Sequence, residues 1–183
     1  IFTQKDFIFT YKILNSIINK FGNYEIYLKF GKTGFFRKIK IILCLFLFSN
    51  IKELISNIRI EKLSNKFKFI NEEKVEKFEF GLIINYPNKI IAQDYDIYNF
   101  HLGNLANQRG SFIFFYKFKK KWDEISLTFH KITDELDKGL IINEKKINCT
   151  NMSSFQILNL YIKNINFINK SIDMIINNNY NPY

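Results

Sequence analysis

Cysteine, proline, glycine and tryptophan are all scarce in this sequence of 183 residues. It contains two cysteines, two prolines, seven glycines and one tryptophan. The cysteines, Cys44 and Cys149, are too few and too far apart for a disulfide scaffold or a structural zinc site. This usage is typical of the reducing cytoplasm, where we expect the protein to reside, and we predict no bound metal.

Long apolar runs are missing as well. The longest, residues 39–48, is interrupted by Lys40. It is far shorter than the roughly 20 residues that cross a bilayer. No secretory signal is recognisable either. We therefore predict no membrane partner and interpret the run as part of a buried helix.

The chain does contain enough apolar residues for a sizeable core. Hydrophobic residues make up 47% of it, which excludes a wholly disordered chain. The 27 Lys and Arg exceed the 17 Asp and Glu by ten, which at first suggests a nucleic-acid partner. However, the sequence is crowded with Phe, Ile, Asn, Lys and Tyr, the amino acids of A/T-rich codons. Such a bias raises the Lys content whatever the function, so we do not expect nucleic acid as the partner.

One alternative of another class depends on that charge. The basic stretch from Lys117 to Lys121 would suit a module that binds RNA or a ribonucleoprotein. Its simpler interpretation is a solvated helix end, because cations are favoured near a helix C-terminus.

The apolar spacing predicts strands that alternate with helices. We expect strands at 1–3, 24–30, 67–70, 78–85, 97–100, 125–132 and 140–147, and helices at 4–21, 35–58, 72–77, 111–118 and 154–176. This order predicts an α/β fold with a mostly parallel central sheet, flanked by helices and followed by a long C-terminal helix. Strand 125–132 alternates apolar and polar residues, so it should be half-buried.

The predicted C-terminal helix carries an apolar residue at every third or fourth position. This stripe consists of Leu158, Tyr161, Ile165, Ile168, Ile172 and Ile175. It could form a homodimer interface or dock the helix on the sheet of its own chain. We favour docking.

Polar residues stand where two of the predicted strands end, the edge at which open α/β sheets bind ligands. Asn99 and His101 share one face of their strand because successive side chains alternate. His130 opens the segment HKITDELDKG, which contains three acids and ends in glycine. The only two histidines of the chain thus lie at two strand ends, and histidine has the unperturbed pKa nearest neutrality.

The first of these segments resembles a signature of folate-dependent formyltransferases. Asn99-x-His101, followed by Leu105 and by Arg109-Gly110, is similar to Asn-x-His-Pro-Ser-Leu-Leu-Pro-x-Tyr-Arg-Gly. The family's two prolines are Leu102 and Ala106 here, which predicts a more flexible loop.

The second segment, from Thr128 to Gly139, resembles the family's other signature, His-x-x-Thr/Asp-x-x-x-Asp-x-Gly. The order of the two segments and their strand contexts agree with the family over about residues 79–147. The resemblance implies a Rossmann-like formyltransferase fold. Residues 1–150 would form the catalytic domain, with 151–183 as a helix and tail packed on it.

The resemblance also implies an enzyme that moves a formyl group from N10-formyltetrahydrofolate to a primary amine. Asn99 would donate its amide to the oxyanion that forms, and His101 would stabilise the same oxygen and assist proton movement. Asp137 would accept the proton of the attacking amine, directly or through water. His130 and Thr133 would order water and the Asp137 loop.

The same resemblance implies binding residues for both substrates. The folate would contact the loop around Asp137 and an apolar wall, a set made of Asp134, Glu135, Leu136, Lys138, Tyr86, Ile90 and Ile91. Arg109 and Gly110 would contact the amine substrate.

Three amines are known acceptors in this family. The carboxyl-terminal barrel of the enzymes that act on methionyl-tRNA is not visible after Ile147. The glycine-rich phosphate loop of the glycinamide ribonucleotide enzymes has no counterpart in residues 2–7, although they share the string Thr-Asp-Glu-Leu-Asp. We therefore favour a nucleotide-linked amino sugar and keep the other two amines as alternatives.

Overall fold

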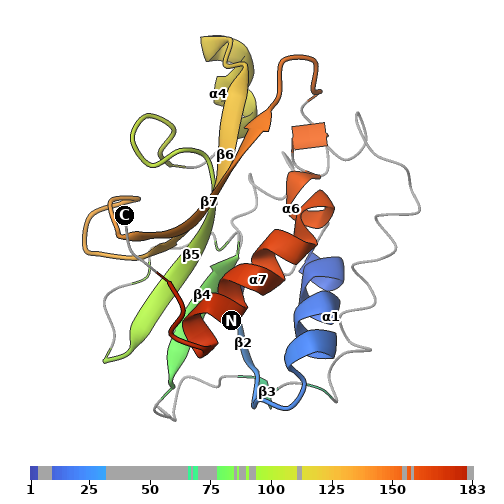
Figure 1. Cartoon of the computed structure of the whole chain (residues 1–183), viewed down its shortest axis with the longest axis vertical. Coiled ribbons are helices and arrows are strands. Elements are labelled where there is room, and N and C mark those ends of the chain that lie inside the picture. Colours follow the sequence, from blue (N-terminus) through green and yellow to red (C-terminus); the bar gives the residue numbers. More distant parts are fainter. Residues whose placement is uncertain are drawn as a thin grey trace. The chain divides into compact units, whose positions relative to one another are not determined.

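The computed structural model describes residues 1–3, 10–31, 66, 68–69, 78–84, 86, 90, 94–110, 113–153, 156–157 and 159–180 (Figure 1). The chain divides into two compact units, unit 1 with Ile1–Glu76 and Ile84–Ile90, and unit 2 with Lys77–Ile83 and Ile91–Tyr183. The helices predicted at 35–58 and 72–77 lie outside the described residues, as do Cys44, Ile91 and Leu158.

The described residues of unit 1 include three parallel strands and one amphipathic helix. β1 (Phe2–Thr3), β2 (Tyr27–Phe30) and β3 (Lys68–Phe69) pair in the order β3-β2-β1. The helix α1 (Thr10–Phe21) lies between β1 and β2 in the sequence and buries one apolar face, with residues at three- and four-residue spacing. The parallel pairing and this strand–helix–strand order confirm the sequence prediction for these residues.

Unit 2 contains the strands that carry the site. β4 (Phe80–Ile84), β5 (Asp96–Leu102), β6 (Glu124–Lys131) and β7 (Ile141–Asn148) lie in that order, although Ile84 itself is assigned to unit 1. The pairings β5–β6 and β6–β7 are antiparallel. The parallel pairing found in unit 1 therefore does not extend to these three strands.

β6 is covered on both faces, so the prediction of a half-buried strand is wrong. Every residue from Ile125 to His130 is buried. Its polar side chains alternate with apolar ones as the sequence indicates, but they are enclosed by polar partners instead of facing water. Thr128 Oγ1, for example, donates a hydrogen bond of 2.8 Å to the carbonyl of Gly103 in the loop after β5.

The C-terminal helix is interrupted, in contrast to the continuous helix predicted at 154–176. α6 (Leu160–Lys163) and α7 (Ile165–Ile176) meet at Asn164, whose backbone has φ −114° and ψ 31°. The Asn164 amide donates to the Leu160 carbonyl at 2.8 Å, and such side-chain bonds compete with regular helix geometry.

Four residues of the apolar stripe, Tyr161, Ile168, Ile172 and Ile175, are buried inside the chain, and Ile165 is half-buried. Ile168 is fully buried and Ile172 is 2% exposed, while the Tyr161 hydroxyl donates to the Phe100 carbonyl at 3.1 Å. α7 contacts β7, where the Asn143 amide donates to Ser171 Oγ at 2.9 Å. Figure 1 shows α6 and α7 in red. This burial favours the docked helix over a homodimer interface.

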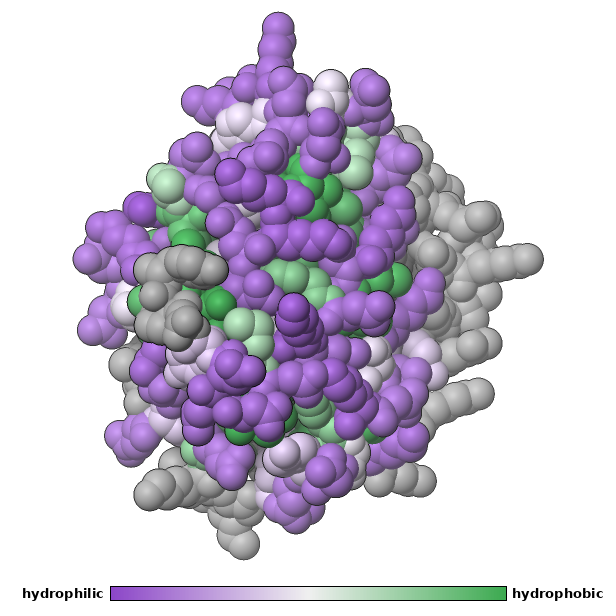
Figure 2. Space-filling view, in the orientation of Figure 1, coloured by the Kyte–Doolittle hydropathy of each residue, from purple (hydrophilic) through white to green (hydrophobic). Residues whose placement is uncertain are grey.

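The basic stretch lies at the end of α4 (Ile113–Lys120). Lys117 is buried and its ammonium donates to the Thr150 carbonyl at 3.2 Å. This lysine of the basic stretch therefore binds a group of its own chain. Figure 2 shows a face that is mostly hydrophilic, with apolar residues in small separate areas. Among the residues described, no helix combines the length and apolar character needed to cross a bilayer.

Replacing Phe129 with alanine should destabilise unit 2. The Phe129 side chain is 0% exposed and stacks on Phe100 with ring centroids 4.3 Å apart. Truncating such a ring costs about 3–5 kcal/mol of unfolding free energy, which denaturant titration would measure. Phe118→Ala is the matched control. It removes a ring that is 45% exposed, and should cost about 0.5 kcal/mol or less. Equal losses in the two variants would contradict this core.

Candidate active site

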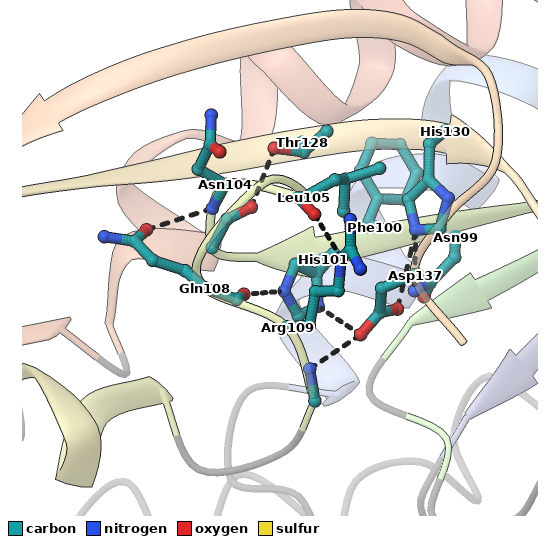
Figure 3. Close-up of polar contacts among 12 residues, drawn as sticks. Asn99, Phe100, His101, Asn104, Leu105, Gln108, Arg109, Thr128, His130 and Asp137 are labelled. Atoms are coloured by element: carbon teal, nitrogen blue, oxygen red, sulfur yellow. Dashed lines mark hydrogen bonds and ion pairs between the residues drawn. The ribbon is translucent and has the colours of Figure 1, made fainter. Parts of the chain in front are cut away.

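The site begins with the pairing of β5 and β6. The antiparallel register sets Asn99 opposite His130 and His101 opposite Thr128. Asn99 and His101 are two residues apart and therefore share one face of β5. The amide Nδ2 of Asn99 lies 3.2 Å from Nε2 of His130 (Figure 3).

Asp137 reaches this face from the turn between β6 and β7. Its carboxylate oxygens lie 3.8 Å from His101 Nδ1 and 3.8 Å from His130 Nε2, and its side chain is buried. The backbone N–H of Gly110 donates to Asp137 Oδ2 at 2.7 Å. A buried charge needs such partners, because desolvation is otherwise costly.

The turn that carries Asp137 depends on two backbone features. Asp137 has φ 49°, in the left-handed region that Asp tolerates better than most residues. A Cβ on Gly139 would lie 1.5 Å from the Lys131 carbonyl oxygen, so only glycine lets the turn close against β6.

His130 is held as a neutral ring. Burial lowers its pKa from 6.5 to about 4, and nearby His101 acts in the same direction, while the Asp137 carboxylate opposes the shift. Its Nδ1 lies 3.2 Å from the Lys131 carbonyl oxygen, which can only accept, so Nδ1 carries the hydrogen. Nε2 is then an acceptor and binds one amide hydrogen of Asn99. This contact fixes the orientation of the Asn99 amide and leaves its second hydrogen for another partner.

The cluster formed by Asn99, His101, His130 and Asp137 thus joins an amide donor, two ring nitrogens and a carboxylate. Such a set can stabilise negative charge on an oxygen and move a proton, as acyl-transfer chemistry requires. Within the described part of the chain, no group of three or more His, Cys, Asp or Glu side chains could hold a metal ion.

The remaining residues predicted from the second signature surround Asp137 on the surface. Thr133, Asp134, Glu135, Leu136 and Lys138 are all exposed. Thr133 Oγ1 donates to the Glu135 carbonyl at 3.2 Å, and Lys138 Nζ forms an ion pair with Glu135.

The other predicted binding residues are more dispersed. Arg109 is exposed and its Nε donates to the Leu105 carbonyl, while Gly110 contacts Asp137 directly. Tyr86 and Ile90 are half-buried and belong to unit 1, whereas the cluster lies in unit 2.

Two residues next to His101 were not predicted from the sequence. Nε2 of His101 lies 2.6 Å from the Gln108 carbonyl oxygen, and Gly103 lies beside both groups. No sequence motif indicates that a backbone carbonyl will contact a side chain. The sequence therefore offered no signal for this contact beyond the presence of a polar residue, Gln108, in the loop after His101.

Comparison with known proteins identifies the fold. No protein-family model matches the sequence, and no curated protein matches it. Among solved structures, an N-formyltransferase from Helicobacter canadensis, in complex with folinic acid and dTDP-3-aminofucose, is similar over 100% of this chain and 65% of its own. The identity is 17% and the TM-score 0.70, so the chain spans about two thirds of that protein's length.

Two further structures show the same similarity. A 4-N formyltransferase from Francisella tularensis is 18% identical, with 100% of this chain and 70% of its own covered and a TM-score of 0.64. A phosphoribosylglycinamide formyltransferase from Streptococcus pneumoniae is 12% identical, with 96% of each chain covered and a TM-score of 0.59. This chain therefore has an α/β fold. More specifically, it has the Rossmann-like fold of the N-formyltransferases, which confirms the fold class predicted from the two signatures.

The lowered pKa of His130 makes the unfolding free energy depend on pH. The unfolded chain takes up this proton near pH 6.5 and the folded chain only near pH 4. The unfolding free energy should therefore fall as the pH is lowered through this window, while above it His130 adds no pH dependence. An NMR titration of the two histidines should show His130 protonating near pH 4.

Asp137→Asn is the control for this assignment. It removes the carboxylate that favours the charged ring, so the pKa of His130 should fall further. A His130 pKa at or above 6.5 in the unaltered protein would contradict the buried neutral ring.

Proposed function

We propose that this chain transfers a formyl group from N10-formyltetrahydrofolate to a primary amine, preferably the amino group of an amino-sugar nucleotide. The observation that carries the proposal is the cluster in unit 2. An amide, an imidazole and a buried carboxylate, from Asn99, His101 and Asp137, gather within an N-formyltransferase fold. N10-formyltetrahydrofolate, when bound, supplies an activated formyl group.

The surface beside Asp137 fits a folate. Leu136 is 72% exposed, a large apolar side chain in a turn that otherwise carries acids and a lysine. An exposed apolar residue next to a buried carboxylate suits contact with a ring system. Asp134, Glu135, Leu136 and Lys138 are therefore the residues we propose to hold it. The apolar wall of Tyr86, Ile90 and Ile91 stays a prediction from the sequence.

Asn99 would stabilise negative charge on the reacting oxygen. One hydrogen of its amide is bound to His130 Nε2 at 3.2 Å, which sets the direction of the other. A donor fixed in advance costs no reorganisation during the reaction, so it stabilises charge better than water does. His130 is thus a positioning residue for Asn99.

Asp137 and His101 would manage the proton of the attacking amine. Asp137 Oδ2 already accepts from Gly110, whereas among the described residues Oδ1 has only His130 nearby, at 3.8 Å. Oδ1 therefore keeps capacity to accept a proton, directly or through water. His101 lies 3.8 Å from the other oxygen and can take part in the same transfer.

The preference for an amino-sugar nucleotide rests on two points. The Helicobacter canadensis protein was solved with dTDP-3-aminofucose, and it has the same fold. The exposed Arg109 adjoins Gly110, which binds Asp137, and a guanidinium there suits the diphosphate of such a substrate. Glycinamide ribonucleotide remains the second candidate, because the Streptococcus pneumoniae protein matches this chain over 96% of both. We propose the cytoplasm as the compartment, in keeping with the free, buried Cys149.

Substituting the proposed catalytic residues should abolish most turnover. Asn99→Ala removes one oxyanion donor, which costs about 10²–10³ in kcat. Asp137→Asn removes the proton acceptor and should cost about 10²–10⁴. Tetrahydrofolate release would be followed with amino-sugar nucleotides, glycinamide ribonucleotide and charged initiator tRNA as acceptors.

Asp123→Asn is the matched control, because Asp123 is an exposed carboxylate in the turn before β6. It should retain full activity. If Asp137→Asn stayed within about threefold of the unaltered protein, Asp137 would have no part in proton transfer.

A further inference from the structure

We propose that the loop from Gly103 to Gly110 is a positioning device that fixes which ring nitrogen of His101 faces Asp137. Gln108 and Gly103 are its essential residues. The inference deepens the proposed function and rests on it only for the kinetic consequence. The state of the His101 ring can be measured whether or not formyl transfer is found.

The Gln108 carbonyl selects one tautomer of His101. His101 Nε2 lies 2.6 Å from this oxygen, which has no hydrogen to give, so Nε2 must carry one. His101 is only 7% exposed, so water cannot easily replace the carbonyl. Nδ1 is therefore the nitrogen on the side of Asp137, at 3.8 Å, and it has no hydrogen bond within the described part of the chain.

The Gln108 side chain holds that carbonyl in place. Its Nε2 donates to the Glu124 carbonyl of β6 at 2.9 Å, and its Oε1 accepts from the Asn104 N–H at 3.0 Å. The Asn104 amide in turn donates to Glu144 of β7 at 2.9 Å. The loop is thus tied to two strands (Figure 3 draws the Asn104–Gln108 contact). These contacts hold the loop in place, a role that the two prolines have in the family's signature and that Leu102 and Ala106 do not provide here.

Gly103 makes the close approach possible. Its φ of 149° favours glycine, and an added Cβ would lie 2.3 Å from the Gln108 carbonyl oxygen and 2.7 Å from His101 Nε2. Any side chain at this position would therefore separate the carbonyl from the ring. The N–H of Gly103 donates to the Ser126 carbonyl at 2.7 Å, which attaches the start of the loop to β6.

The two histidines consequently hold opposite tautomers. The Gln108 carbonyl places the hydrogen of His101 on Nε2, and the Lys131 carbonyl places that of His130 on Nδ1. Both acceptor nitrogens then face the Asp137 carboxylate. His101 Nδ1 is the ring nitrogen that can assist Asp137 in moving the proton of the amine, since His130 Nε2 is occupied by Asn99.

Long-range ¹H–¹⁵N NMR correlations test this directly, because the chain has only two histidines. At a pH above about 7.5, where free imidazole is neutral, we expect one ring in the Nε2–H form and the other in the Nδ1–H form. His130→Asn assigns the signals. In Gln108→Leu and Gly103→Ala, the His101 signals should move toward the average of both tautomers, while unchanged His130 signals report that unit 2 is folded.

The kinetic consequence is a loss in kcat without a loss in folate binding. We expect kcat to fall about 10- to 100-fold in both variants, because a misplaced catalytic group costs rate, with KM for N10-formyltetrahydrofolate within about threefold. Asn107→Ala is the matched control, an exposed residue next to Gln108, and should change neither property. If Gly103→Ala does not fold, Gln108→Leu carries the test.

The outcomes separate the two proposals. If Gln108→Leu keeps the Nε2–H form of His101, or loses it with kcat unchanged, the positioning role is overturned. If the tautomers respond as expected but no amine is formylated by the unaltered protein, the proposed function fails while the effect of the loop on His101 stands.

Discussion

The burial of the Asp137 carboxylate is the constraint on which the rest of the site depends. Removing a charge from water costs several kcal/mol unless hydrogen bonds and opposite charges replace the solvent. Here the Gly110 N–H donates to the carboxylate at 2.7 Å, while the two imidazole rings lie 3.8 Å from its oxygens. To bring these groups together, the turn must adopt a positive φ at Asp137 and pass within contact of β6 at Gly139.

The polar face of β6 links the fold to the chemistry. Ser126, Thr128 and His130 alternate with apolar residues, and all three are buried. The Thr128 hydroxyl and the Ser126 carbonyl bond to Gly103 in the loop after β5, and His130 Nε2 contacts Asn99, so the face that would meet water in an ordinary antiparallel sheet encloses the candidate site instead. The partners of Thr128 and His130 thus include Asn99 and the loop that contacts His101, both parts of the candidate site.

Much of the fold, and the candidate residues that lie together in unit 2, could be predicted from the sequence, because both rest on local patterns. Apolar spacing located β1, α1 and the strands of unit 2, and two short motifs pointed to Asn99, His101 and Asp137. The antiparallel pairing from β5 onward could not be predicted, since strand periodicity is the same in either direction. The helix break at Asn164 and the contact between His101 and the Gln108 carbonyl were also missed. Both depend on particular hydrogen bonds to backbone carbonyls, which no residue spacing records.

Transfer of the formyl carbon itself tests the account most directly. N10-formyltetrahydrofolate labelled with ¹³C in the formyl group would be incubated with the protein and a dTDP-linked amino sugar, and the label followed by NMR. If the cluster of Asn99, His101 and Asp137 promotes attack by an amine, the label will appear in a new amide on the sugar, and only when the amine is present. Release of the label as free formate, at the same rate with or without the amine, would contradict formyl transfer.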